Sequence, residues 1–461
     1  MDLHGRTASL CPVCCRRITA HRQQQDETVY LVKECPEHGL FRTPIWRGEP
    51  SFSSWQRPKI PSVLQNPLTT VRQGCPFDCG LCSAHGQHTC TALIEVTNRC
   101  NLACPVCFAD AGADLAEDLS LAQIEAMYET ILVASGVCNI QLSGGEPTVR
   151  DDLTDIVRLG VHKGFTFIQL NTNGLRLADD PAYAVSLKEA GLASVFLQFD
   201  GITDRAHRSL RGRDLRSIKE RAIRHCAGAG LGVVLVATLV PGVNTEEIFA
   251  IIRYGVSHAP TVRGVHFQPI SYFGRYPRSG PADSKRITLP EVIQCIVSQS
   301  SGMVDARHFA PPGCEHALCS FHGMFLVEEN GRLTSIRSGS SCCDGNRVGL
   351  LPTARAGREQ SVRTTARQWS LPMASMAEKH GVEADASRQD DFDRFLARAR
   401  THTFSISAMA FQDVWNLDLE RLRGCCIHVA TPDGRLIPFC AYNLTSASGR
   451  SLYPRRIETC G

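Results

Sequence analysis

The sequence predicts an α/β fold in which parallel strands alternate with helices. From residue 92 onward, short apolar runs typical of β-strands recur, and amphipathic helical patterns separate them. Polar, glycine-bearing segments follow four consecutive runs, at the positions where parallel α/β proteins collect their functional groups. We therefore expect a doubly wound sheet or a barrel, with its functional site at the carboxyl ends of the strands.

Six strand-like runs and six helical patterns make up this region. The first helix is expected to begin at Ser120, because Gln123 three residues later completes a capping box. The sixth is expected to start near Thr288, with Pro290 in its first turn. The expected strands cover residues 92–96, 139–142, 166–170, 194–199, 232–240 and 264–270, and the other expected helices cover about 151–162, 181–190, 215–229 and 245–256.

Composition and hydropathy argue against several classes of protein. The chain has 461 residues, 43% of them hydrophobic, which is enough for a large core, and its net charge of +3 gives no reason to expect a nucleic acid partner. The longest apolar run, residues 233–240, is too short to span a bilayer. Residues 1–10 carry no apolar signal-peptide core, so we expect a cytoplasmic protein. In that reducing compartment, the 22 cysteines are expected to serve as metal ligands rather than disulfides.

The central motif consists of Cys100, Cys104 and Cys107, directly after the first predicted strand. Thiolates favour iron–sulfur clusters and zinc, and three cysteines at this spacing can converge on one metal centre. Three is one short of the four thiolates that a cluster usually has, so one iron would stay open for chemistry. The alternative is a structural metal site whose fourth ligand lies elsewhere.

A second cluster repeats this spacing at Cys75, Cys79 and Cys82, with Cys90 close behind. Four thiolates saturate a cluster, so we expect a closed, auxiliary site here. His85 and His88 lie in the same loop, either as substitute ligands or as neighbouring residues without a metal role.

The N-terminus carries a metal-knuckle pattern of Cys11, Cys14 and Cys35. A strand-like run at residues 28–32 lies between the two ligand pairs, as in a zinc-ribbon or rubredoxin-like hairpin. The fourth ligand is either His38 or Cys15, and the metal either zinc or a single iron. Unliganded buried cysteines are the alternative.

The regular periodicity ends after residue 300. A predicted hairpin carries Cys425 and Cys426 at one base and Cys440 at the other; together with Cys314 and Cys319 it would make another four-thiolate site. Scattered core cysteines are the alternative. Residues 354–400 are polar and arginine-rich, with helical stretches such as 390–400, and are interpreted as a solvated helix face.

At this point the chain resembles the radical S-adenosylmethionine (SAM) enzymes. Cys100, Cys104 and Cys107 match their cluster motif, with the aromatic Phe108 behind it. The segment Gly144, Gly145, Glu146 and Pro147 matches their "GGEP" motif. The resemblance implies a partial (β/α)6 barrel with small, cysteine-rich metal-binding extensions at both ends, in agreement with the six units above.

The resemblance also implies a mechanism. SAM would chelate the open iron of a [4Fe-4S] cluster, and the segment from Gly144 to Pro147 would hold its amino group. Reductive cleavage of SAM would yield a 5′-deoxyadenosyl radical that abstracts hydrogen from an unactivated carbon. Asn171, Asn173 and Asp200 would contact SAM or substrate, by position. A reducing partner of flavodoxin or ferredoxin type is implied.

The resemblance extends to one subgroup, the tetraether synthases, also called class D radical SAM methyltransferases. The resemblance to this subgroup rests on the N-terminal cysteines, the second cluster and the ending PDGRLIPFCAYN at residues 432–443. It implies two auxiliary [4Fe-4S] clusters and a mononuclear iron or zinc. One auxiliary cluster would use Cys75, Cys79, Cys82 and Cys90, and the other Cys314, Cys319, Cys426 and Cys440, with Cys425 as a competitor for Cys426.

These implications lead to a domain division and to three functional hypotheses. We expect a knuckle and connector at residues 1–70, an auxiliary-cluster segment at 71–91, the core barrel at 92–305 and a C-terminal auxiliary-cluster domain at 306–461. The leading function is carbon–carbon bond formation on lipid chains, which leaves peripheral membrane contact open. The alternatives are C-methylation of a pterin-like or other small molecule, and a non-catalytic electron carrier with several clusters.

Overall fold

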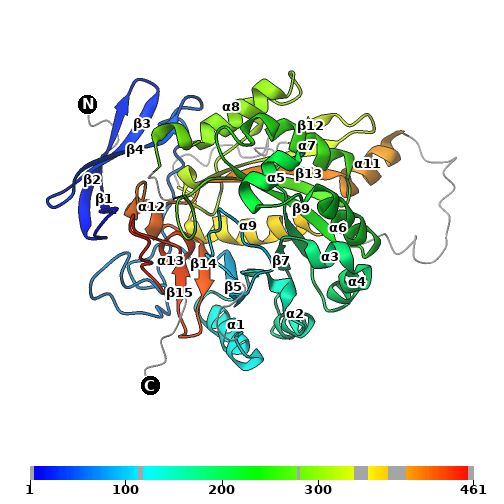
Figure 1. Cartoon of the computed structure of the whole chain (residues 1–461), viewed down its shortest axis with the longest axis horizontal. Helices are drawn as coiled ribbons and strands as arrows, with labels where there is room; N and C mark the ends of the chain where they lie inside the picture. The colour runs from blue at the N-terminus through cyan, green and yellow to red at the C-terminus, as the bar shows by residue number, and fades with distance from the viewer. Residues whose placement is uncertain (1–4, 113–117, 278–280, 337–350, 372–390, 455–461) are drawn as a thin grey trace.

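A small antiparallel sheet forms the N-terminal part of the molecule (Figure 1). The computed structural model describes residues 5–112, 118–277, 281–336, 351–371 and 391–454. Turns that carry the knuckle cysteines connect the strands of this small sheet. In order, its strands are β1 (Arg6–Leu10), β2 (Arg17–Gln25), β3 (Thr28–Cys35) and β4 (Gly39–Arg47).

The core is one large, mostly parallel sheet, as the sequence predicted. All six expected strands are present, and each is hydrogen-bonded to the next in parallel register. These strands are β5 (Thr91–Thr97), β6 (Asn139–Gly144), β7 (Ile168–Thr172), β8 (Ser194–Gln198), β9 (Gly232–Leu239) and β10 (Val262–Pro269).

Helices cover one face of these strands. Apolar side chains that alternate along each strand, such as Ile94, Leu142 and Val195, are fully buried in the main hydrophobic core with them. The first helix does begin with the predicted capping box at Ser120. The helices are α1 (Leu121–Ser135), α2 (Leu153–His162), α3 (Leu175–Asp179), α4 (Pro181–Glu189), α5 (Asp204–Arg211), α6 (Arg216–Gly228), α7 (Ile248–Ser257) and α8 (Leu289–Gln299).

The C-terminal strands extend this same sheet at both edges. Strand β13 (Thr403–Met409) pairs in parallel with β10, and β14 (Ile427–Ala430) pairs in parallel with β5. Beyond them lie the antiparallel strands β11 (Ser320–Val327), β12 (Leu333–Ser335) and β15 (Leu436–Pro438). In the part of the chain that the structure describes, the sheet therefore has 11 strands, in the order β12-β11-β13-β10-β9-β8-β7-β6-β5-β14-β15.

The arginine-rich segment contains a helix that lies across the opposite end of the sheet from the predicted site. This helix, α9 (Ala354–Trp369), brings the carbonyls of Gln368 and Trp369 to Arg263 and Gly232, at the starts of β10 and β9. Residues 372–390 of the segment lie outside the described residues. The remaining helices are α11 (Asp391–Thr401), α12 (Leu419–Arg423) and α13 (Phe439–Tyr442).

Among the described residues, no helix is both long and apolar enough to cross a membrane.

Candidate metal and cofactor site

The loop with Cys100, Cys104 and Cys107 leaves the carboxyl end of β5, as predicted. Cys104 is buried, and the other two thiols are half-buried. Burial raises the pKa of Cys100 to about 12 and also raises the pKa of Cys104. The three sulfurs interact electrostatically. Thiolates in such surroundings need a cation to balance them, so this donor set fits an iron–sulfur cluster.

Two arginines hold this loop from different sides. The Nη1 of Arg275 donates to the Cys104 carbonyl at 3.1 Å, and its backbone pairs with that of Cys107 in both directions. The Nη1 of Arg211 donates to the Val106 carbonyl at 3.1 Å. These contacts position the loop, and the Arg211 guanidinium also interacts electrostatically with the Cys104 and Cys107 thiols.

The GGEP segment lies against the same loop because its glycines allow a very close approach. A Cβ on Gly144, whose φ is +118°, would lie 2.1 Å from the carbonyl oxygen of Thr97. A Cβ on Gly145 would lie 2.1 Å from the carbonyl oxygen of Arg99. The amides of Gly145 and Glu146 donate to these two oxygens at 2.8 and 2.9 Å. Any side chain at either glycine would separate the two segments.

The Glu146 side chain forms hydrogen bonds within the protein and does not face outward. It is 1% exposed and accepts hydrogen bonds from Thr148, from the Thr172 hydroxyl and from the amide of Asn173. Pro147, also buried, starts the short helical turn that follows. The motif's carboxylate thus ties the end of β6 to the end of β7, and its backbone remains the candidate SAM contact.

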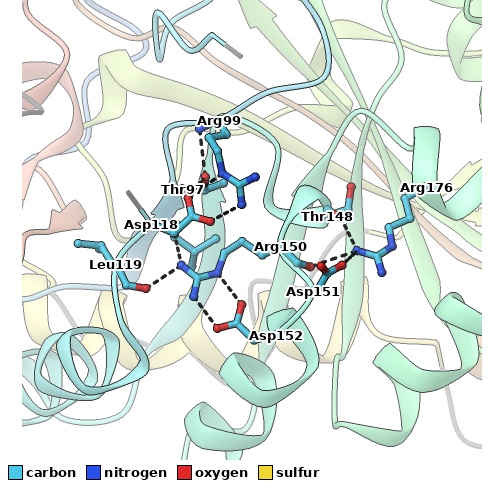
Figure 2. Close-up of polar contacts among 10 residues, drawn as sticks. Thr97, Arg99, Asp118, Leu119, Thr148, Arg150, Asp151, Asp152 and Arg176 are labelled. Carbon is cyan, nitrogen blue, oxygen red and sulfur yellow. Dashed lines mark hydrogen bonds and ion pairs between the residues drawn. The ribbon is translucent and has the colours of Figure 1, made fainter. Parts of the chain in front are cut away.

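An arginine–carboxylate network surrounds the ends of β5 and β6 (Figure 2). The Nη1 of Arg150 donates to the carbonyls of Val96 and Leu119, both at 2.8 Å, while its other nitrogens pair with Asp152. Nearby, Arg99 pairs with Asp118. On the right of Figure 2, Arg176 of α3 donates to the carbonyls of Thr148 and Arg150. The network therefore holds the cluster loop and the GGEP segment in one arrangement.

The other predicted SAM contacts differ in whether their side chains already have hydrogen-bond partners in the protein. Asn173 is buried and donates to the Asn101 side chain at 2.7 Å. Burial acts to raise the pKa of Asp200, but the paired guanidinium of Arg211 holds it below its usual value. Asn171 is half-buried, and its side-chain oxygen has no hydrogen-bond partner among the described residues. Of the three, Asn171 is the one with a buried side-chain oxygen whose hydrogen-bonding capacity is unused.

The N-terminal knuckle brings together Cys11, Cys14, Cys35 and His38, whose ligand atoms all lie within 4.8 Å of one another. The Nδ1 of His38 is 3.4 Å from the Cys35 sulfur and 3.7 Å from the Cys11 sulfur. Such spacings fit a tetrahedral site with bonds of about 2.0–2.3 Å. Cys15 instead packs in a different apolar cluster, so the structure favours His38 over Cys15.

The predicted placement of Cys90 is wrong. Its thiol lies with those of Cys314 and Cys426, all three buried and within 4.8 Å of one another, and not with the Cys75 group. The cause is the parallel pairing of β14 with β5, because Cys426 precedes one strand and Cys90 the other. The Cys426 carbonyl accepts the Cys90 amide at 2.8 Å. This contact joins residues far apart in the chain, which spacing could not reveal.

The predicted set of Cys314, Cys319, Cys426 and Cys440 is therefore divided. Cys319 and Cys440 interact electrostatically with each other and with Cys425, the residue expected only as a competitor. The Nη2 of Arg421 donates to the Cys319 sulfur at 3.3 Å, and the Gln412 amide donates to the Cys440 sulfur at 3.2 Å. These three thiols form a further candidate ligand group.

The other three residues of the predicted Cys90 set, Cys75, Cys79 and Cys82, lie close together. They line one small cavity together with His85 and Arg423. The loop is shaped by Asp78, whose Oδ2 accepts the backbone amides of residues 72, 73 and 74, each at 2.6 Å. The Nε2 of His85 donates to the Cys425 carbonyl, 2.7 Å away.

Strand alternation places a set of polar side chains on the sheet face opposite the one whose apolar residues pack in the main core. Each of the strands β5 to β10 contributes one half-buried polar residue to it. Sequence reasoning missed all but one of them, although an acidic residue inside the apolar run of β5 was a visible signal. We call these residues the polar ring; they are Glu95, Gln141, Asn171, Gln198, Thr238 and Gln268.

Comparison with known proteins identifies the family. Residues 94–255 match the family model described as the radical SAM superfamily, and residues 3–47 match the model of the HMPTM N-terminal zinc ribbon domain. The chain is 34% identical, over 96% of its length and 94% of the relative's, to 7,8-dihydro-6-hydroxymethylpterin dimethyltransferase of Methanocaldococcus jannaschii. The chain belongs to the radical SAM superfamily. As a radical SAM protein it binds a [4Fe-4S] cluster and SAM and requires a reductant.

Other relatives match the core of this radical SAM protein. GTP 3′,8-cyclase of Pelotomaculum thermopropionicum is 33% identical over 48% of the chain and 66% of the relative. Among solved structures, Streptococcus suis SuiB bound to SAM aligns with 14% identity and a TM-score of 0.38 over 47% of this chain and 48% of that one.

Proposed function

We propose that this radical SAM protein methylates a carbon atom of a pterin, such as 7,8-dihydro-6-hydroxymethylpterin. The observation that carries the proposal is the polar ring, with one hydrogen-bonding side chain from each of six strands. A pterin is a flat ring whose edges carry several donors and acceptors. Such a ligand can satisfy many of these side chains at once.

A lipid chain fits the same surface poorly. Covering a polar side chain with hydrocarbon leaves its hydrogen bonds unmade, at a cost of roughly 1–3 kcal/mol for each group. Four of the six already have one partner inside the protein, so the cost applies to their remaining donors and acceptors and to Asn171 and Gln268, and it offsets part of the gain from burying an alkyl chain. The polar ring therefore favours the pterin version of the hypothesis over lipid-chain coupling.

Similarity over the whole chain supports the same substrate class. The relative from Methanocaldococcus jannaschii matches over 96% of this chain, and residues 3–47 match the HMPTM zinc ribbon model. A shared core would indicate only shared radical chemistry. Similarity that includes both extensions is more consistent with a shared substrate.

The bound cluster and SAM would supply a carbon radical able to abstract hydrogen from an unactivated position. Cys100, Cys104 and Cys107 would hold the cluster, and the backbone of residues 144–147 would hold SAM. Among the chain's own groups, Arg211 and Arg275 keep the loop in place. Asn171 would bind SAM or substrate, and its buried side-chain oxygen has no hydrogen-bond partner among the described residues.

We further propose that the remaining cysteines hold auxiliary metal. Cys75, Cys79 and Cys82 would hold one centre, Cys90, Cys314 and Cys426 a second, and Cys319, Cys425 and Cys440 would complete these or hold a third. The knuckle of Cys11, Cys14, Cys35 and His38 would hold zinc or a single iron. We keep the division at residues 70, 91 and 305 as a proposal for the order of these units along the chain. The C-terminal unit contributes strands to the core sheet.

The test is a turnover assay with anaerobically reconstituted protein, SAM, a low-potential reductant and the dihydropterin. Parallel reactions would contain SAM alone, or SAM with a methylene-carrying reduced folate, as the one-carbon source. We expect mass spectrometry to detect a methylated pterin together with 5′-deoxyadenosine, and Cys104→Ala to abolish both. Formation of 5′-deoxyadenosine without pterin methylation from either source would reject the substrate while leaving the radical chemistry intact.

A further inference from the structure

Glu95 is the acidic member of the polar ring and has a fixed orientation. It lies on β5, five residues before Cys100, and its side chain is half-buried. The Tyr442 hydroxyl donates to Glu95 Oε2 at 2.9 Å. Tyr442 is itself 8% exposed and belongs to α13, packed in an apolar cluster with Leu93 and Ile437. The carboxylate is thus held in one position close to the cluster loop.

The neighbouring side chains are oriented as well. The Nε2 of Gln141, on the adjacent strand β6, donates to Gln169 Oε1 at 2.8 Å. Gln169 in turn donates to the Ser194 hydroxyl at 3.2 Å. This chain of amides crosses three strands beside Glu95. Gln169 and Ser194 are fully buried, so a ligand would meet only the Gln141 side chain, which they hold in one orientation.

Aromatic rings lie deeper on the same face. Phe196 packs against Trp369 of α9 with ring centroids 5.6 Å apart, and against His266 at 5.4 Å. The indole nitrogen of Trp369 donates to the Ser405 hydroxyl at 3.2 Å. Because α9 lies across the starts of β9 and β10, this aromatic floor limits how deep a ligand extends.

A carboxylate in this position selects a particular ring edge. An ionised carboxylate only accepts hydrogen bonds, and its two oxygens can receive two parallel N–H groups. A 2-amino-4-oxopyrimidine ring presents two such donors side by side, its N3–H and its 2-amino group. Pterins and guanine nucleotides both carry this edge.

We propose that Glu95 is the specificity-determining residue of the substrate site, binding the N3–H and 2-amino donors of a 2-amino-4-oxopyrimidine ring. Tyr442 positions the carboxylate for that contact. This inference rests on the proposed function, because it concerns the same site. It also adds a residue that sequence motifs do not identify, and it specifies which edge of the substrate faces β5.

The test measures binding rather than turnover. Reconstituted holoenzyme with SAM and without reductant would be titrated by anaerobic calorimetry with three probes: the dihydropterin, GTP, and the 2,4-dioxo analogue of the dihydropterin, in which an oxygen replaces the 2-amino group. We expect Glu95→Gln to weaken binding of the dihydropterin by roughly 10- to 100-fold, the loss typical of a hydrogen-bonded charged partner. We expect the same variant to bind the 2,4-dioxo analogue more tightly than the wild type does, because a glutamine amide complements one donor and one acceptor.

Two further variants control the measurement. Tyr442→Phe keeps the carboxylate but removes the hydrogen bond that orients it, so a smaller loss of dihydropterin affinity is expected. Glu125→Gln removes an exposed carboxylate of α1 that pairs with Lys163, and should bind all probes as the wild type does. Cluster absorbance and substrate-free formation of 5′-deoxyadenosine would show that each variant is folded and loaded.

The outcomes separate the two proposals. Binding of the dihydropterin by Glu95→Gln with unchanged affinity, and no change in preference for the dioxo ring, would overturn the role of Glu95. If wild-type protein binds GTP but no pterin, and Glu95→Gln loses GTP, the role of Glu95 stands while the pterin proposal fails. If the wild type binds none of the probes, both proposals fail.

Discussion

The ring of Phe108 packs against the ring of Phe439, with centroids 5.7 Å apart and planes inclined by 48°. Phe108 follows Cys107 directly, and Phe439 directly precedes Cys440. Phe439 also packs against Phe411 at 4.4 Å. Two cysteine groups distant in sequence are thus joined by an aromatic contact between their immediate neighbours.

This contact predicts a large stability loss when Phe439 is truncated. Phe439→Ala should cost about 3–5 kcal/mol of the free energy of unfolding, since it removes a buried ring from a packed cluster. Anaerobic denaturant unfolding of the loaded protein measures this loss. Val133→Ala, at a side chain 65% exposed, serves as the control and should change little. A Phe439→Ala variant as stable as the control would show that the ring contact is not important for packing.

The buried pair of Asp200 and Arg211 predicts a specific double-variant result. Arg211→Met leaves a fully buried carboxylate without its partner, so we expect a loss of about 3–5 kcal/mol. Asp200→Asn in the same chain should recover much of this loss, because the remaining amide carries no charge. Unfolding of both variants and of the double variant measures the coupling. Additive losses would contradict it.

His266 predicts a pH dependence of stability. Burial lowers its pKa in the folded protein to about 4, whereas an unfolded histidine titrates near 6.5. Between these two pH values the unfolded state binds more protons, so stability falls as pH decreases through this window, by up to about 1.4 kcal/mol per pH unit. Well above pH 6.5, where the unfolded histidine is also neutral, this residue contributes no slope. His266→Gln should reduce the loss between pH 6.5 and 5, measured as the shift in melting temperature against wild type.

The knuckle predicts the loss of one metal ion without loss of cluster iron. His38→Ala should remove or weaken the ion held with Cys11, Cys14 and Cys35, because a tetrahedral site needs its fourth ligand. His38→Cys should retain it, and Cys15→Ala should have no effect on metal content. Elemental analysis of zinc and iron per chain measures each outcome, and metal loss in Cys15→Ala alone would reverse the ligand assignment.

The corrected position of Cys90 predicts which cysteine variants act together. Cys90→Ala and Cys426→Ala should each lower the iron content by up to about four atoms per chain, and the double variant should lose no more than either one. By contrast, Cys90→Ala combined with Cys82→Ala should lose iron additively. The reverse pattern would return Cys90 to the Cys75 group.

Local patterns predicted the strands, the capping box of α1 and the placement of the GGEP segment. Each of these depends on residues close together in the chain. The pairing of β14 with β5 and of β13 with β10 was not predictable, since register between distant strands leaves no local periodicity. The partner of Cys90 was missed for that reason. The same holds for Trp369, whose position on the inner face depends on how α9 lies against the strands and not on its own sequence. Helix α5 was missed because its eight residues are mostly polar.

Strand β5 has a cysteine of one group directly before it and a cysteine of another shortly after it. Cys90 precedes the strand, Cys100 follows it, and Glu95 lies between them. Seven residues of extended chain span roughly 23 Å, so β5 connects the cluster loop to the Cys90 group, for which we propose auxiliary metal. Metal at the Cys90 end would brace the strand on which substrate recognition and SAM chemistry both depend. Under iron limitation, molecules that lack metal at the Cys90 end would then have a less rigid β5. Their substrate would be positioned less accurately, even where the SAM-binding cluster is intact.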